Sequence, residues 1–199
     1  DDRIAVLGYG EGGAIALRAA RREGRIKGVG LLAVPGTTGE DVTLEQQRQM
    51  LDRTGVNAEG QQLRIALQQQ IIDAVKSGKG WENIPPSVRK QADTPWFRSW
   101  LQFDPEKAID DVNKPILILQ GALDAETPPS HADLLEGYAR ARKRPDSFTR
   151  KVIVPGVNHL LVPASSGEVD EYALLPDLNV STAVTSAIVD WLGATMPAR

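Results

Sequence analysis

Short, nearly continuous apolar runs alternate with helix-forming segments toward both ends of the chain. Such runs are typical of strands that are buried on both faces of a parallel sheet. The predicted strands are Ile4–Gly8, Ile26–Val34, Pro115–Gly121 and Phe148–Val154, and the predicted helices between and after them are 14–23, Ser130–Arg142 and Val180–Leu192. This alternation predicts an α/β fold, a parallel-sheet sandwich of four strands with helices on both faces.

The middle of the chain has a different pattern. Residues 38–111 are polar with helical periodicity, and glycines and prolines interrupt them. A helical stretch of this length is too long for a simple strand-to-strand crossover. The sequence therefore predicts a helical cap inserted at 38–111 and a core made of 1–37 and 112–199.

Composition narrows the function classes. The 199 residues carry 23 Lys and Arg against 26 Asp and Glu, and this net charge of −3 argues against a strongly basic nucleic-acid binder. No cysteine is present, which excludes disulfides, thiolate catalysis and cysteine-based zinc sites. Two histidines, His131 and His159, cannot form a multi-histidine metal site. We expect no metal, no cofactor and no nucleic-acid partner.

Membrane and targeting signals are missing from the pattern as well. No apolar run reaches transmembrane length, and the opening Asp1-Asp2-Arg3 does not resemble a signal peptide. We expect no membrane span. The sequence is compatible with the cytoplasm, the bacterial envelope and secretion.

Candidate chemistry follows the predicted strands, because catalytic residues of open α/β sheets lie at the carboxyl ends of the strands. The first strand leads into a glycine cluster at residues 8–13. The third leads to Asp124, and the fourth leads to Asn158 and His159. An acid after one strand and a histidine after the next is the order of a Ser…Asp…His catalytic triad.

Three motifs resemble those of the α/β-hydrolase superfamily. The segment G-Y-G-E-G-G at residues 8–13 is similar to the family's nucleophile elbow, G-H-S-E-G-G. Gly121–Asp124 with Pro128 matches the acid motif, and Gly156–His159 matches G-x-N-H. The chain is most similar to the C-terminal half, from strand five onward, of bacterial esterases grouped near the secreted dipeptidyl aminopeptidases. The resemblance extends over the whole chain.

This resemblance implies a serine-type carboxylic ester hydrolase acting on a small acyl ester. His159 would be the general base, Asp124 the acid that orients it, and the backbone N–H of Glu11 an oxyanion donor. The nucleophile position, however, is Gly10. Glycine relieves the strain of the elbow but removes the attacking oxygen, so the sequence predicts a disabled hydrolase with negligible turnover. The alternative is a non-catalytic small-molecule binding protein on the same scaffold.

The family resemblance also implies that the chain assembles with another polypeptide. The family's first four strands, and one oxyanion donor with them, have no counterpart in this chain. We therefore expect Ile4–Leu7 to be an unprotected apolar sheet edge, which tends to pair with another strand. The expected partner is the N-terminal half of the same fold as another polypeptide, or a second copy in a strand-exchanged homodimer. Gly10→Ser alone is then not expected to restore turnover.

Other interpretations of the same residues remain. Gly8, Gly10 and Gly13 formally match the dinucleotide fingerprint G-x-G-x-x-G, but the next strand ends without the acidic residue that this site requires. His131 is expected to be a solvated residue at a helix start. An aromatic cluster is expected to serve mostly in packing, and one or two of its members are candidates for lining an acyl pocket. The cluster consists of Trp96, Phe97, Trp100 and Phe103.

Overall fold

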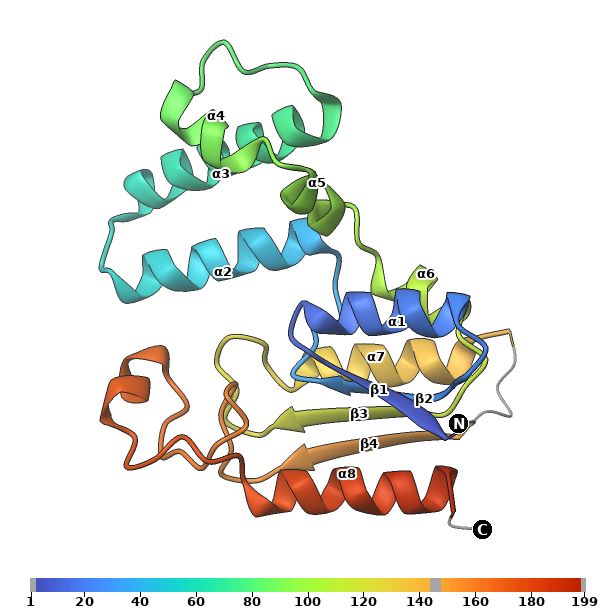
Figure 1. The fold of residues 1–199 in the computed structure, drawn as a ribbon. Coiled ribbons are helices and arrows are strands. Elements are labelled where there is room, and N and C mark those ends of the chain that lie inside the picture. The colour runs from blue at the N-terminus through green and yellow to red at the C-terminus, as the bar shows by residue number, and fades with distance from the viewer. Residues whose placement is uncertain (1–2, 144–147, 198–199) are drawn as a thin grey trace. The chain divides into compact units, whose positions relative to one another are not determined.

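One parallel sheet organises the larger part of the molecule. The computed structural model describes residues 3–143 and 148–197. Its strands lie in the order β1-β2-β3-β4, and every neighbouring pair is parallel (Figure 1). The strands are β1 (Ile4–Tyr9), β2 (Ile26–Leu32), β3 (Ile116–Gly121) and β4 (Thr149–Val154). The predicted fold class, a four-stranded parallel α/β sandwich, is confirmed.

Helices cover both faces of this sheet. Two of them, α1 and α7, lie on one face, and α8 lies on the other (Figure 1). A short helix, α6, packs against α1 and α7. The helices are α1 (Gly12–Arg22), α6 (Pro105–Asp110), α7 (Ser130–Ala141) and α8 (Thr182–Thr195), and a 3-10 helix, η1, spans Val169–Leu174.

The core lies where α8 packs on the central strands. The β3 residues Leu117 and Leu119 are fully buried and form one cluster with Trp191 of α8, whose side chain is also fully buried. Burying these apolar side chains removes their surface from water, which is the main favourable contribution to the stability of such a sandwich. This packing fixes α8 against one face of the central strands.

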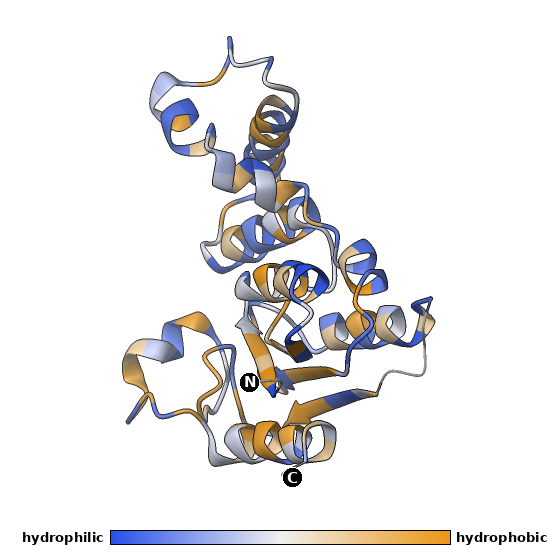
Figure 2. Cartoon of the chain, turned by 45° about the vertical axis from the view of Figure 1, so that its right-hand side comes forward, coloured by the Kyte–Doolittle hydropathy of each residue, from blue (hydrophilic) through white to orange (hydrophobic). Residues whose placement is uncertain are grey.

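The two edges of the sheet differ in character. In β1, the side chains of Ile4, Leu7 and Tyr9 are about 40 % exposed, at 37 %, 42 % and 43 %. The interpretation of this strand as buried on both faces is therefore wrong. Among the described residues β1 pairs with β2 alone, which agrees with the expectation that Ile4–Leu7 is an apolar sheet edge. The strand at the other edge begins with charged residues, and Figure 2 shows it as hydrophilic there: Arg150 and Lys151 of β4.

A second compact unit covers Thr37–Asp104 and is entirely helical within its regular elements. It has a small core of its own, in which Trp81 and Ile72 are buried together with Leu101. Its helices are α2 (Gly39–Arg53), α3 (Ala58–Ser77), α4 (Pro86–Ala92) and α5 (Pro95–Leu101).

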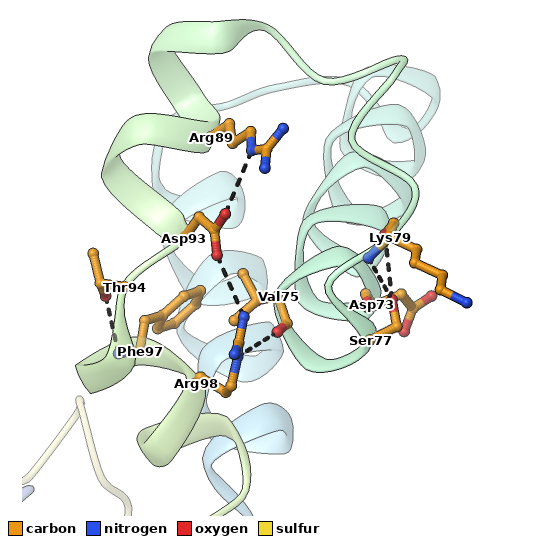
Figure 3. Close-up of polar contacts among 9 residues, drawn as sticks. All are labelled: Asp73, Val75, Ser77, Lys79, Arg89, Asp93, Thr94, Phe97 and Arg98. Atoms are coloured by element: carbon orange, nitrogen blue, oxygen red, sulfur yellow. Dashed lines mark hydrogen bonds and ion pairs between the residues drawn. The ribbon is translucent and has the colours of Figure 1, made fainter.

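A polar junction joins α3 to α5 inside this unit (Figure 3). Arg98 donates through Nε to the carbonyl oxygen of Val75 over 2.8 Å. The carboxylate of Asp93 receives Arg98 on one oxygen and Arg89 on the other, both at 3.4 Å. This junction satisfies a helix-end carbonyl and holds the start of α5 against α3.

The aromatic residues of this unit do not all pack inside it. Phe103 is buried and stacks on Trp100, with ring centroids 6.1 Å apart. Trp96 is 59 % exposed and stacks on Phe97 at 5.8 Å. The packing expectation is therefore wrong for Trp96.

The unit differs in extent from the predicted insertion at 38–111. Its last residue is Asp104, and α6 groups with the sheet because it packs against α1 and α7. The sheet unit consists of residues 1–36 and 105–199, close to the predicted 1–37 and 112–199. Of these, residues 1–2, 144–147 and 198–199 lie outside the described part of the chain.

Candidate active site

The turn between β1 and α1 has the backbone conformation that glycine favours. Gly10 has φ +52°, and its N–H donates to the carbonyl oxygen of Leu32 on β2 over 2.9 Å. Its own carbonyl oxygen accepts the N–H of Gly13 at 3.0 Å, which begins α1. A β-carbon at Gly10 would have no heavy atom within 4 Å. The position therefore has room for a side chain but is strained for any residue other than glycine.

Glu11 follows this turn directly. It occupies the N-cap position of α1 with right-handed helical backbone angles, and it is partly exposed. Its side chain makes no capping hydrogen bond. The residue predicted as an oxyanion donor is thus at the positive end of a helix dipole.

The other two predicted site residues meet at the carboxyl ends of β3 and β4. Asp124 follows β3, His159 follows β4, and His159 Nδ1 lies 2.8 Å from Asp124 Oδ2. The Asp124 side chain is fully buried, and that of His159 is 14 % exposed. Because a carboxylate accepts hydrogen bonds, this contact places a ring hydrogen on Nδ1, so in the neutral form of the ring Nε2 has a lone pair. In the described part of the chain, Nε2 has no hydrogen-bond partner.

The Asp124 carboxylate is held from several sides. Its Oδ1 accepts the backbone N–H groups of Glu126 at 3.0 Å and Thr127 at 2.7 Å. Its Oδ2 accepts the side-chain amide of Gln120 at 2.5 Å in addition to His159. These donors satisfy a carboxylate that would otherwise be costly to bury, and they fix its orientation toward the imidazole.

A close approach of two segments makes this contact possible. A β-carbon at Gly121, the last residue of β3, would lie 2.3 Å from the carbonyl oxygen of Val157. The N–H of Leu123 donates to the same carbonyl over 2.9 Å. Leu161 then turns the chain with a φ of +62°, which is unusual for a branched side chain. His159 lies between these two anchors and is therefore fixed by the backbone on both sides.

Electrostatics favour the protonated form of His159. Burial lowers the pKa of this imidazole, but the hydrogen bond to Asp124 and the charges of Asp124 and Glu126 raise it, and the net pKa is above 6.5. The Tyr9 ring lies 5.3 Å from the imidazole, centroid to centroid. Burial, together with the charges of Glu126 and Asp124, raises the pKa of Tyr9 to about 12, so its hydroxyl is neutral.

His131 has a different role from the one predicted. It is 5 % exposed, and its Nδ1 accepts the backbone N–H of Gly36 over 2.9 Å. The prediction of a solvated histidine is wrong, because α7 packs this residue against the chain that leaves β2. His131 is therefore a structural histidine.

Sequence reasoning missed four residues around the site: Tyr9, Gln120, Glu126 and Tyr172. Gln120 had a signal, since it is a polar residue in an otherwise apolar strand. Tyr9 lies inside the glycine motif. Glu126 and Tyr172 meet across 46 residues, a pairing that local pattern does not contain.

Metal and membrane features are limited in the described residues. Groups of three or more potential metal-ligating side chains do not occur among residues 3–143 and 148–197. Nor is any helix in these ranges long and apolar enough to span a bilayer.

No protein-family model and no curated protein matches the chain. Solved structures with a similar arrangement include a meta-cleavage product hydrolase from Pseudomonas fluorescens, with 15 % identity, 97 % of this chain and 65 % of that chain covered, and a TM-score of 0.46. They also include a lipase-esterase related protein from Clostridium acetobutylicum, with 14 % identity, coverage of 96 % and 66 %, and a TM-score of 0.48. An esterase from Pyrococcus furiosus has 12 % identity, coverage of 98 % and 55 %, and a TM-score of 0.48.

These structural neighbours are hydrolases and esterases of the α/β-hydrolase fold. The chain spans two thirds or less of the length of each of the three. The fold class stated above rests on the chain's own parallel sheet and not on these similarities.

Proposed function

We propose that this chain carries the acid and the base of a serine-type carboxylic ester hydrolase, and that Gly10 at the nucleophile position disables it. The observation that supports this most directly is the 2.8 Å contact between His159 Nδ1 and Asp124 Oδ2 at the carboxyl edge of the sheet. The Tyr9 ring beside His159 brings the turn at Gly10 to the same edge. The proposed relatives are the bacterial esterases grouped near the secreted dipeptidyl aminopeptidases.

The proposed roles follow from the geometry. A hydroxyl introduced by Gly10→Ser would attack the acyl carbon of an ester and give its proton to His159 Nε2. The C–O bond to the alcohol would then break, and the same proton would pass to the departing oxygen. Asp124 keeps the other ring nitrogen protonated. The N–H of Glu11 is the proposed donor to the oxyanion.

Covalent labelling tests this proposal without requiring full turnover. Gly10→Ser should react with an alkyl fluorophosphonate at residue 10, as mapped by mass spectrometry, whereas the chain as given should not react there. The double variant Gly10→Ser/His159→Gln should label roughly 100-fold more slowly, because general-base assistance contributes about 10²–10⁴. Equal labelling of both variants, or none in either, would contradict the proposal.

The alternative is a binding protein on the same scaffold. It is favoured by the absence of a nucleophilic oxygen at Gly10 together with the free space around that residue. A trifluoromethyl ketone that shifts the His159 NMR signals, combined with no fluorophosphonate labelling of Gly10→Ser, would support this alternative over a hydrolase.

The exposed edge of β1 is a candidate binding surface for a partner strand. A hollow of about 710 Å³ lies along it, lined on the strand side by Arg3, Ala5 and Leu7 and on the other side by residues of α8 and Met196. Lys151 on the opposite edge strand is paired with Asp133 and Glu136, but the β1 edge has no such charge inside the strand. We propose that β1 pairs with a further strand, from the N-terminal half of the same fold or from a second copy.

Sedimentation tests the β1 proposal. Material isolated with its partner should sediment above 21.6 kDa. Leu7→Lys, which places a charge in the hollow, should reduce assembly, whereas Leu174→Lys on η1, where the side chain is already 81 % exposed, should not. A monodisperse 21.6 kDa monomer with a cooperative melt would contradict this proposal.

A further inference from the structure

The loop after β3 and the segment after β4 are joined by two side-chain bonds. The first is the contact of Asp124 with His159. In the second, the Tyr172 hydroxyl donates to Glu126 Oε1 over 2.7 Å. In each bond the β3 loop supplies a carboxylate and the β4 segment supplies the donor. The second pair therefore repeats the arrangement of the first.

Both pairs depend on the same carboxylate. Asp124 Oδ2 receives His159, and Asp124 Oδ1 receives the backbone N–H of Glu126 at 3.0 Å. The main chain of Glu126 is thus fixed to the group that orients the imidazole. Its side chain is fixed in turn by Tyr172, so both the main chain and the side chain of Glu126 are held.

Tyr172 itself lies in a segment that is closed by a neighbouring residue. The Glu171 carboxylate accepts the backbone N–H groups of Ser165 at 2.7 Å, Ser166 at 2.9 Å and Gly167 at 2.7 Å. It also accepts the Ser166 hydroxyl at 2.8 Å. Four hydrogen bonds to one carboxylate make a rigid support, which fixes the start of η1 and with it the Tyr172 ring.

The titratable groups recorded next to His159 come from the β3 loop and from β1. The β3 loop contributes Asp124 and Glu126, both of which raise the pKa of His159. The β1 strand contributes Tyr9, whose ring lies 5.3 Å from the imidazole, whereas Tyr172 of η1 bonds to Glu126. Burial first, and then the nearby carboxylates, raise the pKa of both phenols, so neither carries a charge near neutral pH. Glu126 is therefore the second negative charge beside the imidazole.

We propose that Glu126 is a positioning residue for the Asp124–His159 pair: its main-chain N–H holds Asp124, its carboxylate is held by Tyr172, and the β3 loop thereby carries two carboxylates in fixed positions. The proton would leave His159 only at a higher pH than Asp124 alone would set. In a restored hydrolase this would move the onset of general-base catalysis toward alkaline pH. The consequence for catalysis rests on the proposed function, but the effect on His159 does not.

NMR titration of the chain as given tests this directly, because the chain has two histidines and their ring signals can be assigned separately. Glu126→Gln keeps the shape and can still accept from Tyr172, but it removes the charge. It should lower the His159 midpoint by about half a unit, less than the roughly 1–3 units typical of a directly paired charge. Tyr172→Phe should lower it less, and Glu126→Asp should retain part of the shift.

Asp170→Asn is the matched control. It removes one negative charge from η1, the 3-10 helix that carries Tyr172, and should leave the His159 midpoint unchanged. The amide signal of Gly36, whose N–H donates to His131 Nδ1, should keep its position in all variants and reports an intact fold. If Glu126→Gln leaves the His159 midpoint in place while Asp124→Asn lowers it, the proposal for Glu126 is overturned and the Asp124–His159 pair stands. If neither variant moves it, the pair itself is overturned, and the proposed function with it.

Discussion

The side-chain nitrogen of Gln120 lies 2.5 Å from Asp124 Oδ2, inside the core of the sheet unit. The same nitrogen lies 2.7 Å from the carbonyl oxygen of Thr127. Both neighbours are acceptors, so the orientation of the amide is fixed, because the flipped form would place Oε1 against two oxygens. Oε1 itself is buried and has no hydrogen-bond partner in the described part of the structure. Gln120 thus serves as a donor to the buried carboxylate.

Replacing this donor should destabilise the protein. Gln120→Leu removes a hydrogen bond to a buried charge and should lower the free energy of unfolding by about 1–3 kcal/mol. Denaturant unfolding measures the change. Gln62→Leu on the exposed side of α3 is the control and should have little effect. A loss below about 0.5 kcal/mol for Gln120→Leu would mean that the backbone donors hold Asp124 without it.

Gln120→Glu should add a pH dependence. The new carboxyl group would face two acceptor oxygens, so its pKa in the folded state would be raised above its usual value of about 4.3. A raised folded pKa stabilises below the unfolded pKa, and that stability is lost as the pH rises. The variant should therefore unfold more readily at pH 7 than at pH 4, relative to the parent chain. The same loss at both values would contradict this.

Two glycine substitutions should have opposite effects. At Gly121 a methyl group would press on the Val157 carbonyl at 2.3 Å, so Gly121→Ala should cost about 1–3 kcal/mol and weaken the contact of His159 with Asp124. At Gly137, inside α7, nothing lies within 4 Å, and Gly137→Ala should stabilise by about 0.5–1 kcal/mol. Denaturant unfolding gives both values. A neutral Gly121→Ala would mean that the two segments can separate freely.

The turn at Gly10 should resist other residues for a backbone reason alone. Its φ of +52° makes Gly10→Ala cost about 1–2 kcal/mol, although no neighbour obstructs the methyl group. Gly12→Ala, two residues later at the start of α1, has equal room and no positive φ, so it should be close to neutral. Thermal melts of the two variants compare them. Equal melting temperatures would show that the turn relaxes.

The support under Tyr172 should respond to acid. The hydrogen bonds from the backbone N–H groups and the hydroxyl at residues 165–167 lower the pKa of Glu171 to about 2, from 4.5. A lowered folded pKa means that its contribution to stability is present above pH 4.5 and is lost as the pH falls toward 2. The amide proton shifts of Ser165 and Gly167 should titrate with a midpoint of about 2. A midpoint near 4.5 would mean that these bonds are open in solution.

Much of the fold was predictable because the signals are local. Continuous apolar runs identified the first three strands, and the apolar residues 152–154 identified the fourth. The return of the strand–helix rhythm after residue 111 identified the sheet as one α/β layer structure. The placement of Asp124 and His159 was also accessible. Each follows a predicted strand, and parallel strands bring their carboxyl ends to one edge of the sheet.

Tertiary structure alone decided which surfaces and partners those elements have. Ile4 and Leu7 are as hydrophobic as the central strands, yet they are exposed because β1 lies at the edge of the sheet; the hydrophobic pattern did not contain this, and only the family resemblance predicted it. His131 has no local mark of burial, and its partner Gly36 lies 95 residues away. Glu126 and Tyr172 are both polar residues in loops, where side-chain pattern carries no periodicity. Hydrophobic period records which face of an element is buried, but a hydrogen-bond partner depends on where distant segments of the chain meet in space.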